Sequence, residues 1–266
     1  LAQATETYVT APTPVPFAQA DPAALARAVA LLQAAKRPLA VIGTSAMRMH
    51  DAGLLRACVE RHQLPFMTTT MAKGLIDDDH VLGLGCIERS KRKLQRQFIQ
   101  QADLIVALGY DTIEVEYEAW AGQVPVLHVG IEAADVDASV QLALNVVGDL
   151  DHTLKHLIAA TPAKPQWQAQ TLATHRDTFE RALRRVVPNF APHQAIDVVR
   201  QVLPHNGILA FDVGAHTHQI ASQWHAHAPR EFLITNGWSS MGFAIPAALA
   251  AKLAHPERPV VCVLGD

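Results

Sequence analysis

Short apolar runs alternate with amphipathic stretches along most of the chain. The runs at 39–43 and 103–108, for example, are flanked by stretches whose apolar residues recur at helical spacing. Such runs between amphipathic helices are typical of a parallel sheet that helices cover on both faces. The pattern predicts strands at 39–43, 65–69, 103–108, 124–129, 144–147, 207–212, 232–234 and 260–264, and helices at 23–35, 50–62, 91–101, 150–160, 166–187, 191–203, from about 216, and 241–253.

Two proline-rich stretches divide this pattern into units. Residues 1–21 carry three prolines and no periodic apolar residues, so they are predicted to be an extended linker from a missing upstream domain. Residues 22–160 form a predicted central α/β domain. The two prolines within 161–165 predict a second linker. Residues 166–266 then form the first part of a second α/β domain, so the predicted fold class is α/β with two parallel-sheet units.

The two ends of the sequence suggest an excised segment. The chain begins with Leu1, and Asp266 almost directly follows the apolar run at 260–264. A natural terminus seldom falls at the mouth of a buried strand. We therefore expect the second domain to be truncated here.

The composition is that of a globular protein with small-molecule partners. The chain has 266 residues, of which 50% are hydrophobic and 18% charged, and its net charge is −3. No basic excess draws it to nucleic acid or to an anionic membrane surface, and no apolar stretch approaches the roughly 18 residues of a membrane helix. The three cysteines lack CxxC spacing, which favours a reducing, cytoplasmic setting.

Three candidate sites in the second domain follow predicted strands, where ligands bind in open α/β sheets. In the first, Asp212 ends a strand, and Gly214, Ala215 and His216 lead into a helix. The first-turn N–H groups of this helix are able to hold a phosphate, to which His216 is able to donate a hydrogen bond. The alternative is a simple strand-to-helix turn with a surface histidine.

The second candidate is a segment of small residues before a helix. Gly237, Ser239 and Ser240 let a flat ligand approach the backbone, and Met241 follows with a soft, adaptable side chain. The alternative is a helix with Ser239 or Ser240 as its N-cap and Met241 in the core.

The third candidate is the pair Gly265 and Asp266 after the last predicted strand. A carboxylate at this position is able to bind Mg²⁺ beside phosphates. Taken alone, such an aspartate is only a turn residue.

Together and in this order, these segments resemble the opening of the diphosphate-binding domain of thiamine diphosphate-dependent enzymes. The resemblance in the second domain is carried by residues 212–216, 237–246, 255–259 and 265–266. In the first domain, residues 64–70, 73–74, 103–109 and 147–149 resemble the central domain of the same family. Residues 109–114, Gly-Tyr-Asp-Thr-Ile-Glu, look most like the acetolactate synthase branch, especially its catabolic, flavin-independent members. The resemblance covers nearly the whole chain and implies two Rossmann-like units.

This resemblance implies thiamine diphosphate and Mg²⁺ as cofactors and assigns roles to residues. In the family, a bulky aliphatic side chain at the position of Met241 keeps the cofactor bent. The Ser239 carbonyl would accept a hydrogen bond from the 4′-amino group, and the Met241 N–H would meet a ring nitrogen, so these two residues are the implied catalytic ones. The implied cofactor-binding residues are Gly214, Ala215, His216, Gly237, Ser239, Ser240, Met241 and Gly265, and the implied metal ligand is Asp266. Relatives often have a side-chain donor at the Ala215 position, so that contact falls to the backbone here.

The resemblance also implies a reaction. The whole enzyme would decarboxylate a 2-oxo acid such as pyruvate and pass the acyl carbanion to a second carbonyl, giving acetolactate from two pyruvates. In the family, the catalytic glutamate comes from an upstream domain across a subunit interface, and further Mg²⁺ ligands follow the position where this chain ends. We therefore expect a homodimer or homotetramer for the full-length protein and no activity from the isolated segment.

A nucleotide-binding module without catalysis is the main alternative. Residues 83–86, Gly-Leu-Gly-Cys, and the basic run at 89–93 are candidates for holding the diphosphate of ADP or FAD, and some relatives bind such groups in this domain. We favour a solvated helix face instead, because the glycine spacing is not GxGxxG.

Two further alternatives are a zinc site and a purely structural segment. His216, His218, His225 and His227 belong to a set of 14 histidines, but residues two apart on a helix point to different faces, which argues against zinc. For a segment that keeps the fold without catalysis, the upstream domain decides: the catalytic glutamate of the family would be present there in an enzyme and absent in a structural protein.

Overall fold

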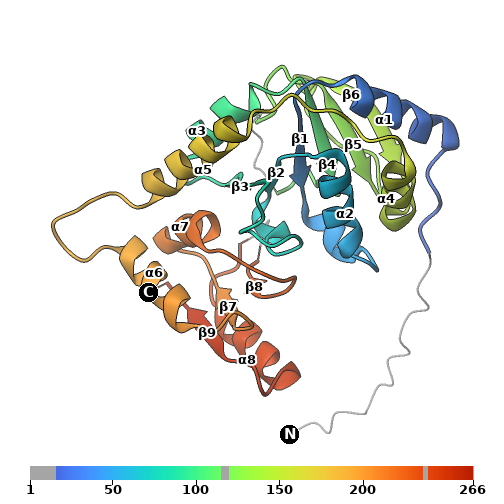
Figure 1. Ribbon diagram of the computed structural model, residues 1–266. Helices are drawn as coiled ribbons and strands as arrows, with labels where there is room; N and C mark the ends of the chain where they lie inside the picture. Colours follow the sequence, from blue (N-terminus) through green and yellow to red (C-terminus); the bar gives the residue numbers. More distant parts are fainter. Residues whose placement is uncertain (1–15, 115–119, 236–238, 266) are drawn as a thin grey trace, which may run out of the picture.

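The computed structural model describes residues 16–114, 120–235 and 239–265. Within these residues the chain forms two parallel sheets, one of six strands and one of three. The larger sheet and its helices occupy the upper part of Figure 1, and the smaller sheet lies below it. The predicted α/β class with two parallel-sheet units is confirmed.

The larger sheet has the strand order β3-β2-β1-β4-β5-β6, and all its pairings are parallel. Its strands are β1 (Pro38–Ile42), β2 (Phe66–Thr68), β3 (Gly83–Cys86), β4 (Leu104–Leu108), β5 (Val126–Gly130) and β6 (Leu142–Val147). This is the order of a Rossmann fold, in which the direction of winding reverses between β1 and β4. The carboxyl ends of these central strands are therefore the expected edge for a ligand.

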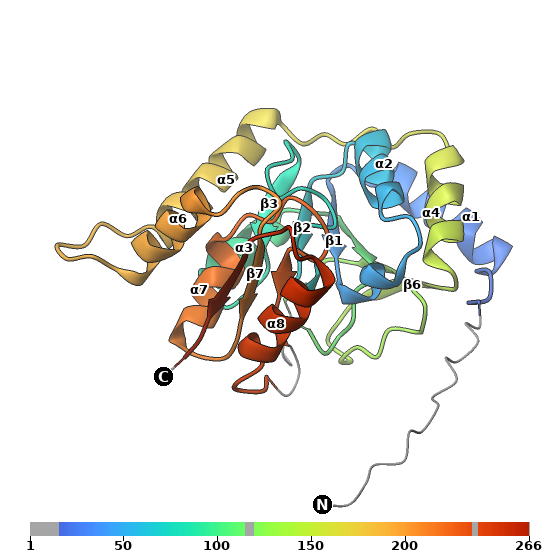
Figure 2. The same ribbon diagram turned by 90° about the horizontal axis from the view of Figure 1, so that it is seen from below.

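Helices cover both faces of this sheet, as Figures 1 and 2 show. One core contains residues of α1 (Pro22–Ala34), α2 (Gly53–His62) and α4 (Leu150–Ala159). The other contains residues of α3 (Arg92–Ile99) and α5 (Ala169–Leu183). Strand β1 sends Ala40 and Ile42 into the first core and Leu39 and Val41 into the second. Every position of the strand is buried, which explains its uninterrupted apolar sequence.

The smaller sheet has the order β8-β7-β9. Its strands are β7 (Ile208–Phe211), β8 (Phe232–Leu233) and β9 (Val260–Val263). Helices α6 (Pro192–Val202) and α7 (Ala215–Gln223) share a core with β7 around Trp224, whereas α8 (Ala244–Ala254) packs against β7 and β9. The central strand β7 therefore carries its following turn, residues 212–214, between the carboxyl ends of two neighbouring strands.

Several details of the predicted elements were wrong. Strand β3 was not predicted, because its sequence Gly-Leu-Gly-Cys has little intrinsic preference for a strand. Its pairing with β2 is a tertiary contact that overrides this preference. Helix α8 begins at Ala244 rather than at Met241, because Gly242 has a φ of +79° and cannot continue a helix. Two short 3₁₀ helices, η1 (Thr44–Arg48) and η2 (Thr70–Ala72), were also missed.

Helix α5 lies after the predicted linker at 161–165 but contacts the first unit. Its Leu172 belongs to the second core of the larger sheet, and a side chain added at Gly85 of β3 would meet Phe179. Ahead of this helix, Trp167 donates a hydrogen bond to the carbonyl of Pro38 at 2.8 Å. The domain boundary stays a prediction, and α5 is the element that connects the two sheets.

None of the helices in the described residues is both long enough and apolar enough to cross a membrane.

Candidate functional site

The buried carboxylate of Asp212 connects the three segments that the sequence singled out. Asp212 follows β7 and its residue is 3% exposed. One of its oxygens accepts the N–H of Gly242 at 3.0 Å, and the other accepts the N–H of Gly265 at 3.3 Å. Hydrogen bonds from N–H groups to a carboxylate are stronger than those between neutral groups. The turn after β7, the turn before α8 and the end of β9 are thus held together by one side chain.

The turn after β7 presents the start of α7 to this junction. The N–H of Gly214 donates to the hydroxyl of Thr217 at 2.9 Å, and this hydroxyl donates to the carbonyl of Asp212 at 2.7 Å. Helix α7 begins at Ala215, which is exposed. Its first N–H groups have no acceptor within the helix itself, and the helix dipole favours an anion there.

His216 lies in the first turn of α7, with its Nε2 atom buried and without a hydrogen-bond partner among the described residues. A buried polar nitrogen left without a partner costs about 1–3 kcal/mol, which an anionic ligand would recover. A side chain added at Gly214 would lie 2.6 Å from the His216 ring. The glycine and the histidine therefore fit a diphosphate held at the start of this helix.

The segment before α8 has a left-handed backbone at two positions. Ser239 has a φ of +46° and Gly242 a φ of +79°. Met241 lies between them and is 76% exposed. The alternative that placed Met241 in the core is therefore wrong. Ser240 is exposed as well. Gly237, the remaining member of this predicted set, lies outside the described residues.

Gly265 completes the junction at the end of β9. A side chain added there would come within 2.8 Å of the Val213 carbonyl, so the two strand ends approach each other closely only because residue 265 is a glycine. The predicted metal ligand Asp266 lies outside the described residues. The Asp212 carboxylate thus joins Gly265 to the turn that contains Met241, next to Gly214 and His216. The sequence did not reveal this organising role of Asp212.

A cleft separates the carboxyl edge of the larger sheet from α7 and Ser239. It is bridged by the carboxylate of Glu88, which contacts Nδ1 of His218 at 2.9 Å and accepts the hydroxyl of Thr70 at 2.7 Å. Burial alone would raise the pKa of Glu88, but the hydrogen bonds from His218 and from the backbone of Arg89 outweigh it and lower this pKa. Glu88 is therefore a charged contact between the two units.

A second carboxyl group, Glu114, faces the same cleft from the loop after β4. It accepts hydrogen bonds from the N–H of Thr44 at 2.7 Å and from the hydroxyl of Thr69 at 2.6 Å. Burial nonetheless raises the pKa of Glu114 to about 7. Glu114 is thus a buried group that titrates near neutral pH and joins the loops after β1, β2 and β4.

The nucleotide-binding alternative loses part of its basis. Residues 83–86 are strand β3, with three of the four residues buried, rather than a phosphate-binding turn. Gly85 approaches Phe179 of α5, which explains the second glycine without a ligand. Arg89 and Arg92 do line the cleft, but the glycine run is not part of a diphosphate cradle.

The four histidines proposed as a zinc set do not converge on one another. His218 contacts Glu88, whereas His225 contacts Asp79 and Glu180. His227 contacts Asp77 at 3.1 Å, and His216 lies at the start of α7. These separate contacts are consistent with the histidine spacing, which disfavours a zinc site made of these four histidines.

Comparisons with known proteins cover both sheets. Residues 25–157 match the model "Thiamine pyrophosphate enzyme, central domain", and residues 212–266 match "Thiamine pyrophosphate enzyme, C-terminal TPP binding domain". The chain is 30% identical over 262 residues to the acetolactate synthase large subunit of Parasynechococcus marenigrum, covering 94% of this chain and 42% of that protein. It is 30% identical over 244 residues to the acetolactate synthase isozyme 1 large subunit of Escherichia coli, covering 90% and 43%.

A third relative is the acetolactate synthase of Bacillus subtilis, 26% identical over 255 residues, with 91% of this chain and 44% of that protein covered. The chain spans less than half the length of these relatives. The central-domain match covers half of the chain, and the second match contains the junction around Asp212. The chain therefore belongs to the thiamine pyrophosphate enzyme family.

Proposed function

We propose that this chain provides the central domain and the first part of the diphosphate-binding domain of an acetolactate synthase-like enzyme that depends on thiamine diphosphate and Mg²⁺. The proposed reaction decarboxylates a 2-oxo acid, with pyruvate as the best case, and ligates the remaining two-carbon unit to a second carbonyl. The observation that carries the proposal is the Asp212 carboxylate, because it gathers the three family motifs at one point. Bound thiamine diphosphate would supply the electron sink for the decarboxylation.

The start of α7 is the proposed diphosphate site. The N–H groups of Ala215 and His216 supply donors with a favourable dipole, and the buried Nε2 of His216 supplies a further one in its protonated tautomer. Gly214 and Gly265 keep side chains out of the space between the strand ends. Asp266 is the proposed first ligand of Mg²⁺, as an oxygen ligand next to the phosphates.

The turn before α8 is the proposed site for the cofactor rings. Exposed Met241 offers a flexible apolar side chain as a support, and the left-handed backbone at Ser239 turns the chain just before it. The Ser239 carbonyl is proposed to accept the 4′-amino group and the Met241 N–H to bind a ring nitrogen. Gly237 and Ser240 complete the proposed contacts. The N–H of Gly242 is committed to Asp212, which fixes the orientation of this turn.

The complete protein is proposed to be a homodimer or homotetramer, in which an upstream domain of one subunit supplies the catalytic glutamate to the site of another. A reducing, cytoplasmic setting is proposed from the cysteines. Cys58 and Cys86 are buried free thiols, and burial raises the pKa of each to about 12, so neither is suited to react as a thiolate.

The test is calorimetric titration of the complete protein with thiamine diphosphate in excess Mg²⁺, followed by product analysis with pyruvate. We expect saturable heat, a higher unfolding temperature and acetolactate as the product. His216→Asn should weaken cofactor binding at least tenfold, whereas His255→Asn should leave it unchanged, because His255 is an exposed residue beyond the end of α8.

Absence of both heat and stabilisation in the complete protein would refute the proposal. The 266-residue chain alone is expected to bind the cofactor weakly or not at all. Tight, Mg²⁺-dependent binding by this chain would show that it already contains a complete site. A flavin that co-purifies with the complete protein would instead favour the nucleotide-binding alternative.

A further inference from the structure

Two segments that are far apart in the sequence meet on the side of the molecule away from the Asp212 junction. One is the acidic turn at 77–79 between η2 and β3, and the other is the extended segment at 225–227 between α7 and β8. Asp78 fastens them together: its N–H donates to the carbonyl of Ala226 at 3.0 Å, and its carboxylate accepts the Ala226 N–H at 2.9 Å. The same carboxylate pairs with buried Lys73 at 2.7 Å. These contacts fix the backbone of both segments.

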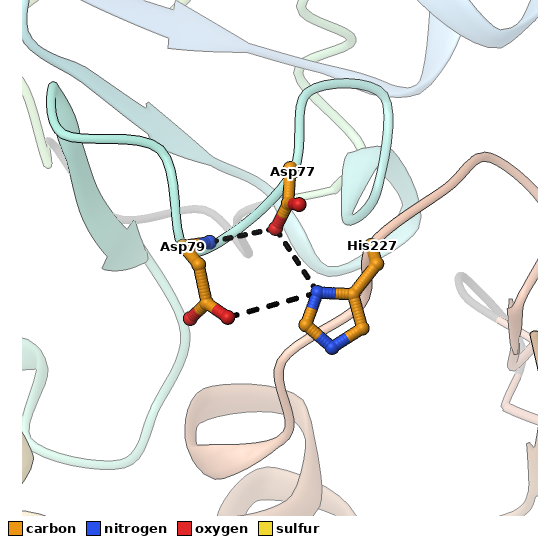
Figure 3. Close-up of side chains that lie close together, drawn as sticks. All are labelled: Asp77, Asp79 and His227. Atoms are coloured by element: carbon orange, nitrogen blue, oxygen red, sulfur yellow. Dashed lines mark hydrogen bonds and ion pairs between the residues drawn. The ribbon is translucent and has the colours of Figure 1, made fainter. Parts of the chain in front are cut away.

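The two neighbours of Asp78 face His227 of the other segment. Figure 3 shows the Asp77 and Asp79 side chains directed toward the ring of His227. Nδ1 of His227 lies 3.1 Å from an oxygen of Asp77 and 3.7 Å from an oxygen of Asp79. One ligand atom from each of the three residues lies within 4.8 Å of the other two. The larger unit thus contributes two carboxylates and the smaller unit one imidazole.

The two separations from His227 are close to those in the coordination sphere of a small transition-metal ion. Bonds of about 2.1 Å to nitrogen and oxygen in a tetrahedral site place neighbouring ligand atoms about 3.4 Å apart. Imidazole and carboxylate are both ligands that Zn²⁺ accepts, whereas Mg²⁺ prefers oxygen ligands alone. A fourth position would be open to water.

The surroundings orient the three ligands, as outer contacts do in metal sites. The second oxygen of Asp79 contacts Nδ1 of His225 at 2.6 Å, and the N–H of Asp79 donates to Asp77 at 2.9 Å. The His205 ring packs on His227 with 4.4 Å between ring centres. The ligand atoms are therefore held in place.

The charges also favour a cation at this point. Among the described residues, Asp77 and Asp79 form ion pairs only with imidazoles. The guanidinium groups whose charges reach them are engaged elsewhere: Arg56 pairs with Glu60 at 2.8 Å, and Arg200 stacks over a tryptophan ring. Two adjacent carboxylates that have no lysine or arginine partner among the described residues attract a divalent cation.

We propose that Asp77, Asp79 and His227 form a binding site for a divalent transition metal of the zinc type, which links the two units of the chain. This site is separate from the Mg²⁺ position proposed at Asp266, and it does not depend on the proposed enzymatic function. The spacing of the histidines disfavours zinc held by histidines alone, whereas two of the three ligands here are carboxylates contributed by the other unit.

The test is titration of the metal-free, untagged chain with Zn²⁺ in excess Mg²⁺, by calorimetry and by thermal unfolding. The exposed thiol of Cys262 is removed as a competing ligand by Cys262→Ser in every sample. We expect one equivalent of Zn²⁺ to bind and to raise the unfolding temperature. Co²⁺ should give the visible absorption of a site with fewer than six ligands.

Asp77→Asn, Asp79→Asn and His227→Gln should each weaken Zn²⁺ binding at least tenfold. The matched control is His255→Gln, since His255 is an exposed histidine 4.0 Å from one carboxylate, that of Glu257, and the part of the chain that the structure describes offers it no third ligand. Circular dichroism establishes whether each variant is folded. If His227→Gln does not fold, the two asparagine variants still test the site, because asparagine keeps the size of the original side chain. No saturable Zn²⁺ binding, or equal affinity in the control and in the three variants, would overturn the proposal.

Discussion

Asp212→Asn is the most direct test of how the candidate site is assembled. The substitution keeps the size of the side chain but replaces one acceptor oxygen by an NH₂ group, which is a donor. The carboxylate now accepts two backbone N–H groups, those of Gly242 at 3.0 Å and Gly265 at 3.3 Å. An asparagine can accept only one of them, so the other N–H loses its partner and faces a second donor.

The magnitude follows from these contacts. A hydrogen bond to a charged group contributes about 1.5–3 kcal/mol, and the surviving bond becomes a neutral one worth roughly 1 kcal/mol. We therefore expect Asp212→Asn to reduce the free energy of unfolding by about 2–5 kcal/mol. For a chain of this size, each kcal/mol lowers the unfolding temperature by about 2–4 °C, so the expected decrease is about 4–20 °C.

Thermal unfolding by circular dichroism measures this effect, with Asp149→Asn as the matched control. Asp149 is also a strand-end aspartate, but it caps α4 through a single N–H, that of His152 at 2.7 Å. Its substitution should cost less, because asparagine is an equally good helix N-cap. In the complete protein, Asp212→Asn should also weaken thiamine diphosphate binding. If the unfolding temperature and the cofactor affinity both stayed at their wild-type values, Asp212 would not be the organiser of the site.

The other predictions concern one exposed residue, one titrating residue and one glycine contact. Met241→Ala in the complete protein should lower kcat at least tenfold without changing the unfolding temperature, because the side chain is 76% exposed; equal turnover would remove its proposed role. The raised pKa of Glu114, about 7, means that its contribution to stability is fully present below about pH 4 and is lost as the pH rises through 7. The free energy of urea unfolding should therefore fall less between pH 5 and pH 8 in Glu114→Gln than in the wild type, and an equal fall in both proteins would contradict the raised pKa. Gly85→Ala should destabilise by about 2–4 kcal/mol, because the new side chain meets Phe179 at 2.8 Å at a φ of +87°. Gly242→Ala, at a φ of +79° with nothing within 4 Å, should cost only about 1 kcal/mol, and equal losses in urea unfolding would refute the proposed contact.

Much of the fold could be predicted because its signals are local. A strand such as β4 is buried at every position, so its apolar run is uninterrupted, and the amphipathic helices between such runs require crossover connections and hence parallel strands. The prolines at 161–165 likewise fall in a segment without helix or strand. Element ends were less certain, since caps such as the left-handed Gly242 depend on a single residue.

Strand β3 shows where local signals fail. Its two glycines resemble a phosphate-binding turn, whereas the structure pairs them with β2 and places Phe179 against one of them. Only the position of α5, almost a hundred residues further along the chain, explains that glycine. Sequence spacing does not carry this information, because the contact forms between elements whose own patterns are independent.

The sequence by itself determined the α/β class, the parallel sheets and the three segments of the candidate site, since each depends on residues that are neighbours along the chain. Only the tertiary structure decided that the Asp212 carboxylate joins those segments and that Asp77 and Asp79 meet His227. Asp77 and His227 are separated by 150 residues in the chain and lie 3.1 Å apart in space. The packing of the two sheets through α5 creates such pairs, and no periodicity within either segment encodes them.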